Sequence, residues 1–331
     1  MILLLSLSFA IDNKDLMTSD LPGCSHWNFN SYSGYIPVDK TNKFHYVFLE
    51  SQDNPGKDPL IVIFSGGPGW SSMNTLFQEN GPCVFYGLDS SSFPHDNQYS
   101  WNTNASILYV ESPLGVGFNI GYQGEENNDE LSATLHVNFL ENWFEKYPDF
   151  KSRDLYLNGE SYVGVYVPML AVYLHQANLT EKAGGFMKLK GIMVGNPLTS
   201  WKYDGIPAYI EIAYFHGLIP KDLKESIEEN KCEYLGFNQQ PLSKIWERNL
   251  DLFENYTRAI DPLDIYRKFG DGFSLIKSSK DQNFIQLEYF ENLFGASYAE
   301  YMNREDVREI LHILKEFEHF SPCSDINYKE K

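Results

Sequence analysis

Residues 154–164, DLYLNGESYVG, decide the fold of this chain. Their first half, Asp154 to Asn158, alternates apolar and polar residues as a short strand does. Gly159-Glu160-Ser161 follows at once, and the apolar stretch Tyr162 to Ala177 has the length of a helix. A serine on a tight strand-to-helix turn is held strained and exposed, so that its hydroxyl can attack a carbonyl group. The pattern therefore makes Ser161 a candidate nucleophile.

The same pattern has a second interpretation. A nucleophilic serine of this kind is usually followed two residues later by glycine, but that position here is Val163, and the glycine is Gly164. A serine near the start of a helix is more often an ordinary N-cap, whose hydroxyl accepts a backbone N–H. Taken alone, residues 154–164 leave both interpretations open.

A glycine-rich turn upstream favours catalysis. Residues 65–72, SGGPGWSS, follow directly on the apolar run Leu60 to Phe64. Consecutive glycines let the backbone approach a substrate closely and direct N–H groups at it, as the stabilisation of an oxyanion requires. The alternative is a plain turn. Because this turn and Ser161 occur in the right order on predicted parallel strands, together they favour an acyl-transfer site.

The rest of the chain predicts an α/β fold. An amphipathic helix is indicated where Leu131, Leu135, Phe139, Trp143 and Tyr147 recur every four positions before Pro148. Strands alternating with helices predict a mostly parallel sheet with helices on both faces. The segments read as strands are residues 44–50, 60–64, 106–110, 154–158 and 189–194. Charged, helix-compatible stretches such as residues 221–231 predict a helical insertion, a cap, at about residues 200–300.

Composition narrows the class of partner. The chain has 331 residues, of which 43% are hydrophobic, so it can bury a large core. Its formal net charge of -19 argues against a nucleic acid or an anionic membrane surface as partner. No apolar run after the leader is long enough to cross a bilayer.

The N-terminus and the sequons indicate the secretory pathway. Residues 1–10, MILLLSLSFA, resemble a signal peptide that ends in a small-x-small cleavage pattern, which leaves residues 11–331 as the mature domain. Three N-glycosylation sequons agree with an extracellular, lysosomal or vacuolar location, and they begin at Asn104, Asn178 and Asn255. Four cysteines, Cys24, Cys83, Cys232 and Cys323, permit three pairings there, and their spacing indicates no zinc site. We expect no metal and no cofactor.

A run of motifs resembles the serine carboxypeptidase family of α/β-hydrolases. The motifs extend over nearly the whole chain after the leader, and they are residues 21–23 (LPG), 65–72 (SGGPGWSS), 101–102 (WN), 111–118 (ESPLGVGF), 159–168 (GESYVGVYVP), 191–197 (GIMVGNP), 216–219 (HGLI) and 301–312. The resemblance implies an α/β-hydrolase fold and a serine-type carboxypeptidase. Such an enzyme releases C-terminal residues from peptides or proteins through an acyl-enzyme, here at Ser161.

The resemblance also assigns roles around Ser161. It implies that the N–H groups of Gly67 and Tyr162 form the oxyanion hole. The free carboxylate of the substrate is then expected to meet a second set of groups, the side chains of Glu160 and Ser65 and the N–H of Gly66. A carboxyl group can bind a carboxylate only by sharing a proton, because two like charges at that distance resist joint ionisation.

Two positions depart from the pattern of the family. Position 65 is usually asparagine, so Ser65 offers one shorter donor, and the affinity for a free C-terminus is expected to fall by ~1 to 2 kcal/mol. Position 70 is usually a cysteine that pairs with the one at position 323. With Trp70 in its place, Cys323 is expected to be a free thiol.

The largest departure concerns the general base. Family members place a catalytic aspartate and then a histidine far downstream of the serine, and this sequence stops at Lys331 before either motif, so it reads as truncated before the last strands of the sheet. None of its eight histidines fits well. His175 is about 21 Å from Ser161 at helical rise. His312 and His319 have the right chain order but lie in a helical stretch and a polar tail, and Asp271 is an equally weak candidate for the acid.

Two other functions therefore stay open beside a carboxypeptidase of doubtful activity. The chain could be a catalytically inactive binding protein that keeps the fold but not the reaction. It could also be an acyltransferase, an activity that plant relatives in the family perform, although only the altered Ser65 speaks for this. Oligomeric state and side-chain preference cannot be read from the sequence.

Overall fold

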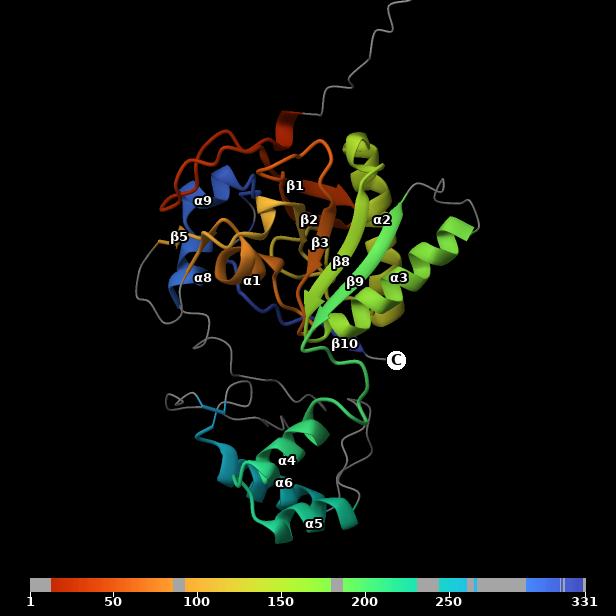
Figure 1. The fold of residues 1–331 in the computed structure, drawn as a ribbon, viewed down its shortest axis with the longest axis vertical. Coiled ribbons are helices and arrows are strands. Elements are labelled where there is room, and N and C mark those ends of the chain that lie inside the picture. Colours follow the sequence, from red (N-terminus) through yellow and green to blue (C-terminus); the bar gives the residue numbers. More distant parts are fainter. Residues whose placement is uncertain are drawn as a thin grey trace, which may run out of the picture.

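A central sheet of six strands organises the chain in a computed structural model (Figure 1). The structure describes residues 13–85, 93–179, 187–230, 244–260, 265–266, 296–315, 317 and 319–329. In spatial order, the strands are β1 (Ser31–Pro37), β2 (Lys43–Leu49), β6 (Ser106–Val110), β3 (Leu60–Phe64), β8 (Asp154–Glu160) and β9 (Lys188–Gly195). Strands β6, β3, β8 and β9 are parallel, whereas β1, β2 and β6 pair antiparallel.

Two hydrophobic cores lie on opposite faces of this sheet. One core packs helices α2 (Asp129–Lys146) and α3 (Val163–Leu179) against alternate strand residues such as Val62 and Leu108. The other packs helices α1 (Ser72–Thr75), α8 (Ala296–Met302) and α9 (Glu305–Ile310) against the intervening residues, among them Ile63 and Ile107. Figure 1 shows α2 and α3 on one side and α1, α8 and α9 on the other. Because both faces are covered, the central strands are apolar throughout.

Three further helices form a separate small core below the carboxyl ends of the strands (Figure 1). They are α4 (Ile206–Phe215), α5 (Lys221–Glu229) and α6 (Lys244–Thr257). Buried residues from each meet there, including Ala213, Ile227 and Phe253. The sequence predicts a helical cap at about residues 200–300, and these three helices lie within that range. Residues 267–295 lie outside the described residues.

Short elements complete the described chain. Four are helical turns, η1 (Asn13–Asp15), η2 (Leu76–Asn80), η3 (Trp101–Thr103) and η4 (Pro148–Phe150). Four are two-residue strands, with β4 (Cys83–Val84) paired to β5 (His95–Asp96) and β7 (Asn127–Asn128) paired to β10 (Tyr328–Lys329). None of the described helices has the length and apolar character needed to cross a membrane.

The predicted fold class is confirmed, with one addition. All five predicted strands are present, as is the helix that begins near Leu131. Strand β1 was not predicted because its sequence, SYSGYIP, is polar and contains glycine, yet its residues are almost all buried against β2 and α2. These residues have little intrinsic preference for a strand, but antiparallel pairing with β2 and burial order them as one.

One disulfide is present among the described residues. It joins Cys24 to Cys83, with the two Cα atoms 5.7 Å apart. Cys323 is a free, exposed thiol, and Cys232 lies outside the described residues.

Candidate active site

Ser161 occupies a strained turn at the carboxyl end of a central strand. Strand β8 ends at Glu160 and α3 begins at Val163, so the N-cap position belongs to Tyr162 and not to Ser161. The φ angle of Ser161 is 65°, a left-handed conformation that a residue with a side chain rarely adopts. The Ser161 side chain is exposed. This geometry supports the nucleophile interpretation over the N-cap interpretation.

Backbone hydrogen bonds hold the turn on both sides. The N–H of Ser161 donates to the carbonyl oxygen of Gly195 at 3.0 Å. Its own carbonyl oxygen accepts from the N–H of Gly164 at 3.0 Å and from that of Leu198 at 2.9 Å. Strained residues persist at functional sites only where the surroundings fix them in this way.

The glycines around the serine are required by close packing. A β-carbon on Gly159 would lie 2.5 Å from a methyl group of Val163, and one on Gly164 would lie 2.5 Å from the carbonyl oxygen of Leu198. The helix therefore approaches β9's outgoing loop at Gly164, one residue later than the usual pattern. Val163 fits because its side chain fills the space that the missing side chain of Gly159 leaves.

The glycine-rich turn lies directly against the serine. A β-carbon on Gly66 would lie 2.9 Å from the β-carbon of Ser161 and 2.8 Å from the nitrogen of Tyr162. The next residue, Gly67, is exposed and has a φ angle of 113°. The two segments that carry the N–H groups of Gly67 and Tyr162 therefore meet beside Ser161. This is the arrangement that an oxyanion hole requires.

A buried carboxyl group accepts hydrogen bonds from the end of the glycine-rich turn. Glu111 is fully buried and accepts hydrogen bonds from Ser71 Oγ at 2.9 Å and from the N–H of Ser72 at 3.2 Å. Burial raises the pKa of Glu111 to about 7. A β-carbon on Gly117 would lie 2.2 Å from Oε1 of Glu111, so only glycine fits there. Glu111 thus fixes the start of α1, which follows the turn.

A second carboxyl group faces Glu160, and the sequence analysis missed it. Glu160 is exposed and accepts from Nδ2 of Asn196 at 3.2 Å. Part of the Glu79 side chain also reaches solvent, yet the surrounding protein desolvates its carboxyl; this and the negative charge of Glu160 raise the pKa of Glu79 to about 7. Thr75 hydrogen-bonds Glu79, and its Oγ1 is 3.1 Å from Oγ of Ser65. The structure therefore brings Ser65, Thr75, Glu79 and Glu160 together.

A signal for Glu79 was present in the sequence. Thr75 and Glu79 are four residues apart, a spacing that places side chains on one face of a helix. The short helix that carries them starts where the glycine-rich turn ends. An acidic residue on the helix after such a turn could have been named as a partner for Glu160.

No described histidine hydrogen-bonds Ser161. The imidazole of His45 contacts Ser33 Oγ at 3.0 Å, and that of His136 contacts Ser112 Oγ. Burial lowers the pKa of both imidazoles to about 3. His312 contacts the Ser33 carbonyl oxygen at 2.8 Å on β1, which is four strands from β8, or about 19 Å away.

The remaining predicted residues are dispersed. His319 is exposed in the C-terminal segment, and Asp271 lies outside the described residues. Asn104 and Asn255 are exposed, whereas the side chain of Asn178 lies outside the described part. No group of three His, Cys, Asp or Glu side chains in the described part of the chain could hold a metal ion.

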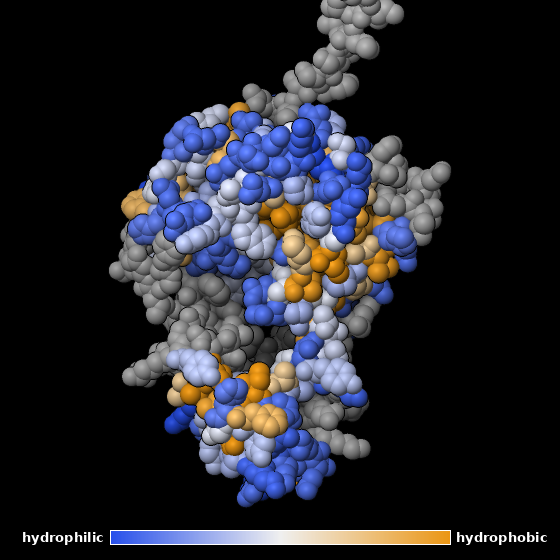
Figure 2. Space-filling view, viewed as in Figure 1, coloured by the Kyte–Doolittle hydropathy of each residue, from blue (hydrophilic) through white to orange (hydrophobic). Residues whose placement is uncertain are grey.

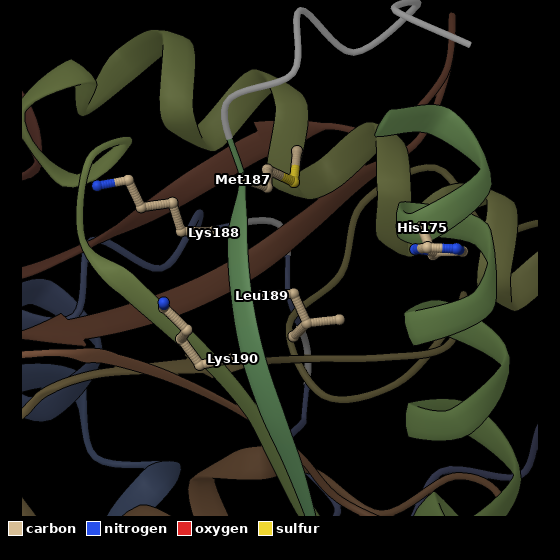
Figure 3. A pocket seen from close by; sticks show the side chains of 5 residues that line it. All are labelled: His175, Met187, Lys188, Leu189 and Lys190. Carbon is tan, nitrogen blue, oxygen red and sulfur yellow. The ribbon is translucent and has the colours of Figure 1, made fainter. Parts of the chain in front are cut away.

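A hollow of about 250 Å³ lies at the far end of the same strands. It is lined by His175, Met187, Lys188, Leu189 and Lys190 (Figure 3). Figure 3 shows His175 on α3, with Leu189 directed toward it from the start of β9 and the two lysines directed to the other side of the strand. Because Ser161 follows the carboxyl end of β8, this hollow is separate from the candidate active site.

A family model and several known proteins are similar to this chain, and they indicate the same family. The family model described as serine carboxypeptidase matches residues 22–331. Serine carboxypeptidase-like 35 of Arabidopsis thaliana is 32% identical over 95% of this chain and 69% of its own length. The lysosomal protective protein of Mus musculus is 36% identical over 71% of this chain. The chain covers 64% of another Arabidopsis relative, serine carboxypeptidase-like 34, and 50% of the mouse protein.

A solved structure shows the same fold. The prohormone-processing carboxypeptidase Kex1(delta)p of Saccharomyces cerevisiae superposes with a TM-score of 0.66, over 89% of this chain and 66% of the yeast chain. Its sequence is 20% identical to this one. At that identity, the likeness establishes the fold alone.

Proposed function

Because this chain belongs to the serine carboxypeptidase family, we propose that Ser161 is the nucleophile of a site that releases the C-terminal residue of a peptide. The observation that carries the proposal is the left-handed Ser161, exposed at the end of β8 with the glycine-rich turn packed against it. A serine held in this way presents its hydroxyl to a carbonyl carbon and its neighbouring N–H groups to the oxygen.

The reaction divides into two acyl transfers. Ser161 Oγ bonds to the carbonyl carbon of the scissile peptide bond while its proton passes to a water molecule, because no described histidine hydrogen-bonds Ser161. The N–H groups of Gly67 and Tyr162 stabilise the negative charge on the carbonyl oxygen. The C–N bond then breaks, the terminal amino acid leaves with a proton on its nitrogen, and water hydrolyses the ester to regenerate the serine.

The general base limits the expected rate. Among the described residues, no histidine hydrogen-bonds Ser161. Without a base, the oxyanion hole and substrate binding still contribute, but the rate is several orders of magnitude lower than with a complete triad. For the 331-residue chain, we therefore expect binding of a peptide C-terminus together with slow acylation.

Recognition of the free C-terminus is assigned to the paired carboxyl groups. Glu79 has a pKa of about 7, so at acidic pH it carries a proton that Glu79 and Glu160 can share with the substrate carboxylate. We assign further donors to the Ser65 hydroxyl, which contacts Thr75, and to the N–H of Gly66, which packs against Ser161. Because this carboxyl pair must carry a proton to bind the substrate carboxylate, acidic conditions favour binding.

Labelling of the serine tests the proposal. The folded 331-residue protein is incubated with a fluorophosphonate, and the labelled residue is identified by mass spectrometry, with Ser161→Ala as the matched control. We expect slow labelling at Ser161 that the control abolishes, and slow release of the last residue from N-blocked dipeptides. Labelling at another serine, or release that survives in Ser161→Ala, would refute the proposal.

A non-catalytic binding protein is the second candidate. His45, His136 and His312 contact Ser33 and Ser112 and not Ser161, which favours it. It predicts that N-acetylated amino acids bind through their free carboxylate while Ser161 stays unlabelled by the fluorophosphonate. Labelling that saturates one serine per chain would exclude it.

We place the protein in the secretory pathway, with peptide or protein C-termini as its partners. The Cys24–Cys83 disulfide supports an oxidising compartment, and Asn104 is exposed in a sequon. Removal of N-glycans from protein expressed in eukaryotic cells should reduce its apparent mass, and Asn104→Gln should remove part of that difference. Protein that is unglycosylated and whose Cys24 and Cys83 are reduced in its native compartment would contradict this location.

A further inference from the structure

Trp70 lies beside the proposed oxyanion hole. A β-carbon on Gly67 would lie 2.9 Å from Cδ1 of Trp70, so the indole ring packs directly on the exposed Gly67. The Trp70 side chain is half-buried, which leaves part of the ring in contact with solvent. A large aromatic ring that borders a catalytic turn is placed to contact whatever that turn binds.

The backbone of Trp70 is fixed on both sides. Its N–H donates to the carbonyl oxygen of Gly66 at 3.1 Å. Its neighbours pair with the C-terminal segment, where Ser71 N–H donates to Pro322 at 3.0 Å and Ser324 N–H donates to Gly69 at 2.9 Å. Trp70 is thus directly opposite Cys323 in a short antiparallel bridge. The backbone position from which the ring projects is therefore set by the fold.

The geometry of a bound peptide places its last side chain near this ring. Only one nitrogen and one Cα separate the scissile carbonyl carbon from the carbon of the terminal carboxylate. The scissile carbonyl belongs beside Gly67, and the carboxylate belongs beside Ser65 and Glu160. The Cα of the last residue therefore lies within a few ångströms of the glycine-rich turn, where its side chain can reach Trp70.

We propose that the indole of Trp70 forms one wall of the pocket for the side chain of the substrate's C-terminal residue, so that this chain prefers an aromatic residue there. The inference rests on the proposed function, because it takes the carboxylate position from it. Aromatic rings gain from offset-stacked or edge-to-face contact beyond the burial of their area. An affinity ratio of about tenfold for phenylalanine over alanine follows from such a contact and from the extra apolar area.

Calorimetric titration with four small ligands tests the inference. The ligands are N-acetyl-phenylalanine, N-acetyl-alanine and the amides of both, and the proteins are the wild type, Trp70→Phe and Trp70→Ala. We expect the wild type to bind the phenylalanine acid about tenfold more tightly than the alanine acid. Trp70→Phe should keep most of that ratio, and Trp70→Ala should reduce it to about twofold while its affinity for the alanine acid stays within about threefold.

The outcomes separate the two proposals. A preference for acids over amides that persists in all three proteins supports the proposed carboxylate site, and its absence from the wild type refutes that site. If acids are preferred but Trp70→Ala keeps the tenfold ratio, the assignment of Trp70 is wrong and the carboxylate site stands. Equal loss of both acids in Trp70→Ala would show a purely structural role and would also overturn the assignment.

Alkylation of the opposite thiol gives an independent readout. Cys323 is exposed and lies directly opposite Trp70, and desolvation raises the pKa of its thiol to about 11, so the reaction is followed at alkaline pH. N-acetyl-phenylalanine should slow the reaction of iodoacetamide with Cys323 in the wild type and in Trp70→Phe, and it should protect Trp70→Ala less. Alkylation rates that N-acetyl-phenylalanine leaves unchanged in the wild type would overturn the proposed pocket.

Discussion

At the residue scale, the backbone conformation of Ser161 favours the proposed nucleophile over an ordinary N-cap. An N-cap serine has an extended backbone and lends its hydroxyl to the helix. Ser161 instead has a φ angle of 65°, and α3 begins two residues later at Val163. Three backbone hydrogen bonds offset the strain of this conformation, which costs about 1 to 3 kcal/mol. The hydroxyl is consequently left exposed for chemistry.

Replacement of Gly66 by alanine should slow the reaction of Ser161 and destabilise the turn. In Gly66→Ala, the new β-carbon would lie 2.9 Å from the β-carbon of Ser161, so either the serine or the turn must move. A displacement of about 1 Å lowers the rate of a positioned reaction by roughly 100-fold, and overpacking costs about 1 to 3 kcal/mol of stability. The rate of fluorophosphonate labelling and a urea titration measure the two effects.

Gly191→Ala is the matched control for Gly66→Ala. A β-carbon at Gly191, on β9, would meet only ring carbons of Tyr156 at 3.4 Å, an ordinary contact. We expect near-wild-type labelling in this variant. Equal labelling of Gly66→Ala and the wild type would contradict the close packing of the turn on Ser161.

The pKa of Glu79 predicts how binding depends on pH. Because desolvation and the charge of Glu160 raise it to about 7, Glu79 keeps its proton below pH 7 and loses it above. A bound carboxylate favours the protonated form, so the affinity for N-acetyl-phenylalanine should fall by up to about tenfold per pH unit above pH 7. In Glu79→Gln, the side chain is neutral at every pH, and the decline should disappear.

Asp154→Asn controls for the loss of a negative charge. Asp154 begins β8, at the opposite end of the strand from Glu160, and its carboxylate is 3.9 Å from the Lys190 ammonium group. Its replacement should leave the wild-type pH profile unchanged between pH 5 and 8.5. A decline above pH 7 that persists in Glu79→Gln would show that another group titrates.

At the element scale, the C-terminal segment supports both halves of the site. On one side, it pairs with the glycine-rich turn through the bridge between Trp70 and Cys323. On the other side, the hydroxyls of Tyr328 and Tyr162 both donate to Oδ1 of Asp129, each at 2.8 Å. Asp129 stands at the start of α2, so this segment links that helix to Tyr162, the residue after Ser161. Residues 319–329 thus connect the glycine-rich turn to the start of α2.

The bridge between the turn and this segment predicts an engineered disulfide. Trp70 and Cys323 form a pair without mutual hydrogen bonds, the class in antiparallel pairs with the closer Cα atoms, about 4.5 Å apart. Trp70→Cys should therefore form a disulfide with Cys323 on oxidation, raising the free energy of unfolding by about 2 to 4 kcal/mol. Intact-mass measurement and denaturation with and without reductant check this outcome.

A double variant gives the control for the new disulfide. Trp70→Cys combined with Cys323→Ser keeps the altered turn but cannot form the bond. It should show no dependence of its stability on reductant beyond that of the Cys24–Cys83 bond. Free thiols at both positions 70 and 323 after oxidation would mean that the two segments are not paired in solution.

At the scale of the whole molecule, the outer edge of β9 is the exposed part of the sheet. Within the described residues, no strand pairs with this edge, and Ile192 and Met193 are 43% and 37% exposed. Val172, on α3, is a further exposed apolar side chain. Figure 2 shows apolar surface over this part of the molecule and a second apolar area over the helices below. An exposed strand edge of this kind can pair with a strand of another chain.

A charge on this edge should reduce self-association. Ile192→Lys places a charged side chain on an exposed edge strand, which disfavours strand pairing between molecules. Sedimentation velocity over a range of protein concentrations should show association of the wild type and a smaller association constant, by about tenfold, for the variant. Thr134→Lys adds the same charge on the exposed face of α2 and should behave as the wild type. A wild type that stays monomeric throughout would contradict this role for β9.

The sequence by itself determined five strands of the sheet, their order along the chain and the strand-to-helix turn that carries Ser161. The apolar run of residues 60–64 is short, β-branched and followed by a glycine-rich turn, which indicates a buried strand, so local pattern and composition were sufficient there. The sequence could not determine β1, whose polar residues are ordered by pairing with β2. The four-residue spacing of Thr75 and Glu79 marks Glu79 as a candidate, but the sequence could not show that its carboxyl group interacts with Glu160, or that Tyr328 donates to Asp129. These contacts join segments that are distant in the chain, and only packing in three dimensions brings them within range of charge and van der Waals forces.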